Sequence, residues 1–357
     1  MKYPNPLNKT LLFILFAIIS CKTFAQFSKT HFIPPNTFWA GGTTTRSEPQ
    51  FQFLYISTPS TDIVDVSIKP VGGIPMTVQV SNSNPYVFEV PFGSEQLFIR
   101  DTDTYDNTTN TYKVYNNKGY IVEADDLVSV TVKMNAGKSN TTGIPTQAAA
   151  IVSKGVAGLG KTFRVATFKN PDYTKNSVNF MSFIATENDT EITIEDIDPG
   201  TLDIGGNVLP SVININLNNG ESYILATKVL TSANPANRDG LIGALVTANK
   251  NIAVNCGSAN GSNQENFTVQ GKPNDFISNK CDFGIDQIAP TNQIGKEYVF
   301  VKGFGLDGME NAIIVAHEDN TEVFANGVVT PIITLKAGDY YSVEGSYYNA
   351  VEGTPGA

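Results

Sequence analysis

The side chains that commonly carry catalysis are few in this sequence. It has two histidines, His31 and His317, and three cysteines. His31 lies in an extended segment bounded by proline, and His317 occupies a position that Thr186 holds in a related part of the chain. A general base must titrate, and a threonine at the matched position does not. Neither histidine is therefore predicted to act in catalysis, and no catalytic residue is assigned.

Carboxylates are plentiful, and glycoside hydrolysis requires a pair of them. Glu187 and Glu318 recur at matched positions. Each precedes a reversal that contains Asn or Asp, so a role in turn structure is the better interpretation. An exported hydrolase is the third and least favoured function.

Asp101, Asp103 and Asp106 lie in the oxygen-rich segment DTDTYDN, which resembles a calcium-binding loop. The segment lacks the glycine and the final glutamate that an EF-hand loop requires. A surface Ca²⁺ site is a weak prediction here, and a solvated hairpin tip is the competing one. No other cofactor is predicted.

The first 25 residues have the pattern of a secretory signal peptide. Lys2 and Lys9 form a positively charged segment before a short apolar run over 11–20, and Ala25 ends a small-residue cleavage site. The alternative is lipoprotein processing, with Cys21 as the lipidated residue. No later apolar run has the length of a membrane helix. We expect a chain exported to the outside or outer surface of a bacterial cell.

Two cysteines, Cys256 and Cys281, remain after the predicted processing. In an exported chain such a pair is expected to form a disulfide, which stabilises by about 3 kcal/mol for a loop of this size. Two unpaired thiols are the alternative. A zinc site is not predicted, because no histidine lies near either cysteine.

The charge balance excludes some partners. The net charge is −10, and removal of Lys2, Lys9 and Lys22 with the signal peptide leaves about −13. Nucleic acids and anionic lipids both need a basic patch, so neither is predicted as a partner. Scattered acidic residues are typical of a chain that is soluble outside the cell.

The elements that must position any site are predicted to be strands. Alternation of apolar and polar residues, separated by turns rich in Asn, Asp and Gly, indicates half-buried strands. Helix signals are weak, and the best window for a short helix is 147–153. The strongest strand windows are 51–56, 64–69, 127–132, 191–195 and 212–217.

The chain repeats itself about every 135 residues. We expect units at 27–159, 160–294 and 295–357, the last of them incomplete, which implies the N-terminal part of a longer protein. Each full unit has room for a β-sandwich or for two propeller blades, and variable connections favour the sandwich. Three blocks recur in the same order: 160–165 with 295–300, 185–191 with 316–322, and 217–223 with 335–341.

Two adjacent tyrosine pairs are the preferred ligand contacts. On a strand, each pair must direct one ring to either face. Exposed aromatic rings stack on sugars or anchor protein partners. The pairs are Tyr340 with Tyr341 and Tyr347 with Tyr348.

The repeated motifs resemble the N-terminal domain of the IgGFc-binding protein family. The segments GKEY, ENAIIVA, EDNT and LKAGDY after Gly295 carry this resemblance, as do NKNIAVNCGS and DFGIDQI before it. The resemblance implies a secreted or surface-displayed binding protein, similar to large exoproteins of bacteria that use type IX secretion. It implies no catalytic or ligand-contact residue.

The predicted function is therefore a non-enzymatic adhesion or binding module of a larger exoprotein. Its ligands would be glycans, mucin-like polymers or proteins. The alternative is a structural stalk that positions other domains.

Overall fold

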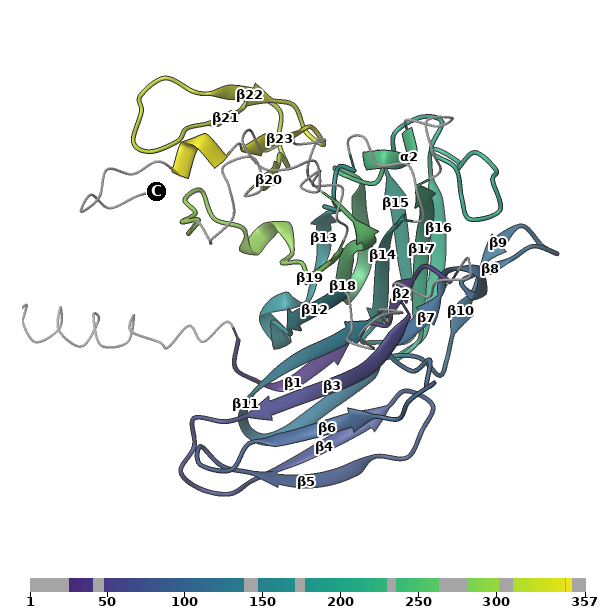
Figure 1. Ribbon diagram of the computed structural model, residues 1–357, viewed down its shortest axis with the longest axis vertical. Helices are drawn as coiled ribbons and strands as arrows, with labels where there is room; N and C mark the ends of the chain where they lie inside the picture. The colour runs from purple at the N-terminus through teal and green to yellow at the C-terminus, as the bar shows by residue number, and fades with distance from the viewer. Residues whose placement is uncertain are drawn as a thin grey trace, which may run out of the picture.

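The computed structural model describes residues 26–40, 48–137, 147–170, 177–229, 236–262, 282–301, 311–343 and 345–348 (Figure 1). These residues are mostly β-strand, which confirms the predicted all-β class. Four of the five strongest strand windows lie within observed strands and the fifth, 212–217, begins one residue before its strand: β3 (Pro49–Ser57), β4 (Val64–Pro70), β11 (Tyr120–Ala136), β15 (Thr190–Glu195) and β16 (Ile213–Leu217).

The first sheet has seven strands in the order β5-β4-β11-β3-β6, with β1 and β12 also paired to β11. The first half of β11 pairs with β1 and β4, and its second half pairs with β3 and β12. Val66 of β4, which pairs with the first half of β11, and Leu54 of β3, which pairs with the second half, belong to a single buried cluster. The two halves are thus layers around a common core, joined through β11. The other bounds are β1 (Ser28–Ile33), β5 (Met76–Val80), β6 (Tyr86–Val90) and β12 (Gln147–Val152).

The second sheet has eight strands in the order β10-β17-β14-β18-β15-β16, with β13 and β19 also paired to β18. The first half of β18 pairs with β13 and β15, and its second half pairs with β14 and β19. Ile194 and Phe183, from opposite halves, again share one buried cluster. The bounds are β10 (Val114–Tyr115), β13 (Gly160–Arg164), β14 (Ser177–Ala185), β17 (Ser222–Val229), β18 (Leu245–Gly261) and β19 (Asp282–Gln287).

The two sheets share the same pairing pattern, including its irregularity. In the first sheet the partner on β11 changes from Val128 to Glu123 between Ser28 and Thr30 of β1. In the second sheet the partner on β18 changes from Ile252 to Thr247 between Gly160 and Thr162 of β13. Each long strand therefore skips the same number of residues at the point where it passes from one layer to the other.

A short parallel pair, β2 (Asn36–Phe38) and β7 (Phe98–Arg100), lies between the two sheets (Figure 1). β2 contacts β14, β17 and β18 of the second sheet. Phe180 on one face of β14 shares a buried cluster with the β2 region, and Phe183 on the other face belongs to the core of the second sheet, so every residue of β14 is buried. The two sheets and the strand pair between them therefore form one continuous packed body.

Four short strands follow near the C-terminal end of the described residues. β20 (Ala312–Val315) pairs with β23 (Tyr340–Val343), as β14 pairs with β17. β21 (Thr321–Val323) pairs with β22 (Ile333–Leu335), as β15 pairs with β16.

Glu187 and Glu318 occupy the same kind of turn. The hydroxyl of Thr190 donates a hydrogen bond to the backbone carbonyl of Glu187 at 2.7 Å, and the hydroxyl of Thr321 does the same to Glu318 at 2.7 Å. The turns also share a residue in the left-handed region, which Asn and Asp tolerate. These residues are Asp189 and Asn320.

Helices are minor in the described part of the chain. They are α2 (Ala236–Asp239) and the 3-10 turns η1 (Asp101–Asp103), η2 (Gly155–Gly158), η3 (Thr291–Gln293) and η5 (Gly345–Tyr348). The predicted short helix at 147–153 is wrong, because this segment pairs with the second half of β11 as strand β12. None of the described helices is long and apolar enough to cross a membrane.

Candidate binding surface

The tyrosines of β23 hold the C-terminal strands in place. The hydroxyl of Tyr340 donates a hydrogen bond to Oδ2 of Asp239 at 2.7 Å. Burial, together with this carboxylate, raises the pKa of Tyr340 above its ordinary value. Tyr341 packs against a small cluster that includes Ala316 and Leu335. Both side chains are half-buried, and the first ties β23 to α2.

Tyr347 and Tyr348 lie in η5 and not on a strand. The backbone carbonyl of Tyr347 accepts a hydrogen bond from Nδ2 of Asn326 at 2.7 Å, and both rings are half-buried. Strand alternation therefore applies to only one of the two tyrosine pairs, and all four side chains are half-buried. Ligand contact by the four tyrosines stays a prediction.

The three aspartates of the weak calcium prediction have separate partners. Oδ1 of Asp101 accepts a hydrogen bond from the backbone N–H of Ala40 at 2.9 Å, and burial of this carboxyl raises its pKa. Oδ1 of Asp106 accepts one from the N–H of Thr108 at 2.8 Å, which lowers the pKa of Asp106. Within the described ranges no three His, Cys, Asp or Glu side chains converge as metal ligands. The structure thus does not bring Asp101, Asp103 and Asp106 together.

Of the two cysteines in the predicted disulfide, the structure describes only one. Cys256 is a free, buried thiol in β18, and burial raises its pKa to about 12. Cys281 lies outside the described residues, as do Cys21 and the predicted signal peptide. The disulfide and the lipidation therefore stay predictions, while the described thiol is unpaired.

His31 belongs to a buried polar network that joins the two sheets. Its Nε2 donates to the carbonyl of Val128 at 3.0 Å, and its Nδ1 lies 3.0 Å from Oγ of Ser153. The same Oγ lies 3.1 Å from Oε1 of Gln287 in β19. A serine in contact with a histidine is the arrangement that activates a nucleophile. Here His31 is 0% and Ser153 1% exposed, so the pair serves structure.

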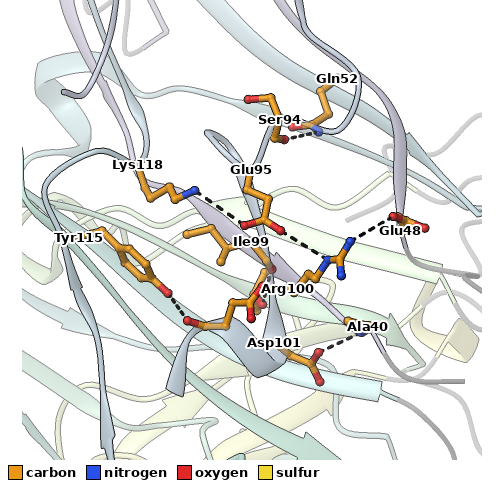
Figure 2. Close-up of polar contacts among 12 residues, drawn as sticks. Ala40, Glu48, Gln52, Ser94, Glu95, Ile99, Arg100, Asp101, Tyr115 and Lys118 are labelled. Atoms are coloured by element: carbon orange, nitrogen blue, oxygen red, sulfur yellow. Dashed lines mark hydrogen bonds and ion pairs between the residues drawn. The ribbon is translucent and has the colours of Figure 1, made fainter. Parts of the chain in front are cut away.

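An ion-paired seam surrounds the end of β7 (Figure 2). Oε1 of Glu95 lies 3.4 Å from Nε of Arg100, and Oε2 lies 3.9 Å from Nζ of Lys118. Arg100 also lies 4.0 Å from Glu48. The Arg100 side chain is 52% exposed, so each of its two ion pairs contributes at most about 1 kcal/mol. The seam has no net charge, because Arg100 and Lys118 balance Glu95 and Glu48. Through Arg100 it links the end of β7 to its neighbours.

Three aromatic rings line the outward side of β3, a central strand of the first sheet. The ring centroids of Phe51 and Phe53 are 6.4 Å apart, and those of Phe53 and Tyr55 are 5.9 Å apart. Phe51 is 48% and Tyr55 38% exposed, while the residues that alternate with the rings are buried. Rings of this size on a central strand usually face a core or a partner. This row is therefore the best candidate for a binding surface.

Two exposed charges flank the row. Lys133 in β11 and Glu89 in β6 pair with Phe53 from its two sides. Nζ of Lys133 also lies 5.9 Å from the ring centroid of Tyr55, which is within cation–π range. These five residues, Phe51, Phe53, Tyr55, Lys133 and Glu89, are called the aromatic face below.

Two open depressions lie on other strands and have a different character. One of about 260 Å³ is lined by β4, β5 and β11, with Asp65 and Thr77 among its residues. The other, of about 360 Å³, is lined by the equivalent strands β15 and β16 of the second sheet, with Glu191 and Asn214 among its residues. Neither depression has an aromatic residue in its lining, so both are solvated surfaces of the sheets.

A family model described as IgGFc binding protein matches residues 148–354, which is more than half of the chain. The chain belongs to the IgGFc binding protein family. This confirms the resemblance seen in the sequence and indicates a binding module. No curated protein and no solved structure matches the chain. The part matched to the IgGFc binding protein family begins in β12, so the aromatic face lies before it.

The sequence contained a signal for the aromatic face that the strand assignment did not use. In Phe51-Gln52-Phe53-Leu54-Tyr55 the three aromatic residues occupy every second position and alternate with Gln52 and Leu54. Aromatic residues at every second position of a strand lie on one face. Whether that face is exposed depends on packing with other elements, which the alternation does not encode.

Proposed function

We propose that this chain is a non-enzymatic binding module that acts outside the cell as part of a larger exported protein. Family membership supports a binding role, and the exposed aromatic face is the observation that carries the proposal. The Ser153–His31 contact, which has the form of a catalytic pair, is sealed inside the fold. The aromatic face, by contrast, is open to large ligands.

The chemistry of the aromatic face suits extended ligands. Aromatic rings stack on the apolar faces of sugars and serve as anchors in protein interfaces. Lys133 and Glu89 add one hydrogen-bonding group of each charge beside the central ring. We therefore propose glycans, mucin-like polymers and proteins as the ligand classes. IgG Fc enters as a probe because the family carries that name.

The shared pairing pattern supports a modular array. We propose that the chain is built from units at 27–159, 160–294 and 295–357, of which the first two contain the sheets with the matching β1–β11 and β13–β18 registers. The buried cluster shared by the two sheets also favours the second function, a stalk that positions other domains. A stalk needs the array but not the aromatic face, so the two functions are separable.

A binding panel with matched variants tests the proposal. The exported chain, its Phe51→Ser variant and its Phe324→Ser variant are each applied to arrayed glycans, purified mucin and IgG Fc. Phe51 and Phe324 are 48% and 49% exposed, so the two changes remove similar exposed rings at distant positions. We expect Phe51→Ser to weaken binding about tenfold and Phe324→Ser to leave it unchanged. Absence of binding by the wild-type chain to every probe contradicts the binding function and favours the stalk.

A further inference from the structure

The aromatic face has a counterpart in the second sheet. Phe53 of β3 pairs with Lys133 in the long strand β11, and Phe180 of β14 pairs with Gly257 in the long strand β18. Both rings lie on central strands, at the same place relative to the irregularity shared by β1–β11 and β13–β18. Tyr55 corresponds in the same way to Ser182.

In the second sheet this face packs against other elements of the same chain. Phe180 is 0% exposed and belongs to the same buried cluster as Phe38 and Trp39, which come from the β2 region. Ile224 and Ala226 on β17 belong to that cluster as well. The fold thus shows what covers this type of face when it is covered, namely another protein layer with aromatic side chains.

The first sheet differs from the second at the positions that flank the ring. Lys133 stands where the second sheet has Gly257, and Glu89 stands where it has Ala226. Burial of either charge without a partner is unfavourable. A layer that covers the aromatic face must therefore supply a carboxylate opposite Lys133 and a cation opposite Glu89.

We propose that the partner of the aromatic face is the aromatic face of a second copy of this chain. This rests on the proposed function, since it names one partner for the same surface. Rotation of one copy by 180° about an axis parallel to β3 places ring row against ring row. The same rotation exchanges the two sides of the strand, so that Lys133 of each copy meets Glu89 of the other. The face is thus self-complementary, as an isologous interface requires.

The size of the face predicts the strength of the contact. Three strands at about 4.8 Å and three same-side residues at about 6.7 Å define an area of roughly 300 Å² per copy. Stable interfaces bury about 800 Å² per partner. The dimer is therefore weak and concentration-dependent, and it competes with other ligands of the same face.

Charge reversal tests the pairing. Sedimentation velocity from about 5 to about 500 µM compares the wild-type chain with Lys133→Glu, with Glu89→Lys, and with an equal mixture of the two variants. Lys69→Glu, at an exposed position on β4, is the control. All changed residues are exposed, so circular dichroism and thermal unfolding should be unaltered. We expect a micromolar wild-type dimer, about tenfold weaker self-association of each single variant, restored association in the mixture, and no change for the control.

Two results overturn the proposal. One is a wild-type chain that stays monomeric over the whole concentration range. The other is a dimer that the charge reversals leave unchanged, because such a dimer uses another surface. If the chain is monomeric but Phe51→Ser still abolishes retention of glycan, mucin or Fc, the second copy is excluded and the binding function stands. If both measurements are negative, the binding function fails as well.

Discussion

At single residues, the buried polar side chains make hydrogen bonds that hold the fold together, and His31 is an example. Burial lowers the pKa of His31, so the ring is neutral in the folded chain near neutral pH. In the unfolded chain a histidine titrates near 6.5. The unfolded state therefore binds more protons than the folded state once the pH falls below about 6.5, and the contribution of the neutral ring to stability is lost as the pH drops further.

We predict that His31→Gln reduces this acid sensitivity. Between pH 6.5 and 5 the free energy of unfolding of the wild-type chain should fall by up to about 1.4 kcal/mol per pH unit more than that of the variant. Urea unfolding at several pH values measures the two slopes. Equal slopes would contradict a neutral, buried His31.

The thiol of Cys256 provides a second test at this scale. Because it is buried with a pKa near 12, it should resist alkylation at pH 8 in the folded chain. After unfolding without reductant it should be labelled fully. Peptide mapping that finds Cys256 linked to Cys281 would instead support the disulfide predicted from the sequence.

At the scale of elements, the junction between α2 and the C-terminal strands depends on a glycine. Gly243 has φ +88°, and an added Cβ would lie 1.9 Å from the backbone oxygen of Gly338. Gly206 has the same φ of +88°, with no atom within 4 Å of its added Cβ. Substitution by alanine therefore strains the backbone equally at the two positions, but only at Gly243 does the added Cβ also clash with another residue.

We predict that Gly243→Ala destabilises the chain by about 3 kcal/mol and Gly206→Ala by about 1 kcal/mol. Chemical denaturation measures the difference. Limited proteolysis should show earlier cleavage within 312–343 for Gly243→Ala, since the displaced contact holds β23. Equal losses for the two variants would show that the Gly338 contact is unimportant.

The strands could be predicted from the sequence, but the state of their faces could not. Alternating apolar residues identified β3, β4, β15 and β16 because a period of two is a local property. β3 carries Phe51, Phe53 and Tyr55 at alternate positions, and β14 carries Phe180 at the position that matches Phe53. One face of β14 is covered by β2 and the matching face of β3 is open, and the alternation within each strand does not encode this difference.

The repeat copies helped most where the turns are tight. Glu187 and Glu318 were assigned to turns because their neighbours matched, and both accept a threonine hydroxyl at their carbonyl. Adjacency of two tyrosines in the sequence does not by itself indicate a strand. η5 holds one pair, and packing against Ala316 and Leu335 covers part of the other.

In the whole molecule, the contacts that build the C-terminal strands are distinct from the aromatic face, the surface proposed to bind. Tyr340 bridges β23 to Asp239 and so belongs to the first class. Tyr340→Phe should lower stability by about 1 kcal/mol through loss of one hydrogen bond. It should leave binding to the ligand panel unchanged. A variant with normal stability and lost binding would move Tyr340 into the second class.

A series of substitutions at Phe53 tests most directly whether the aromatic face is the binding surface. Each probe of the panel that the wild-type chain binds, whether glycan, mucin or IgG Fc, is then titrated with wild type, Phe53→Tyr, Phe53→Ser and the control Phe324→Ser. The account predicts near wild-type affinity for Phe53→Tyr and for the control, and a loss of about tenfold or more for Phe53→Ser. Equal affinity of Phe53→Ser and wild type for every retained probe would contradict it.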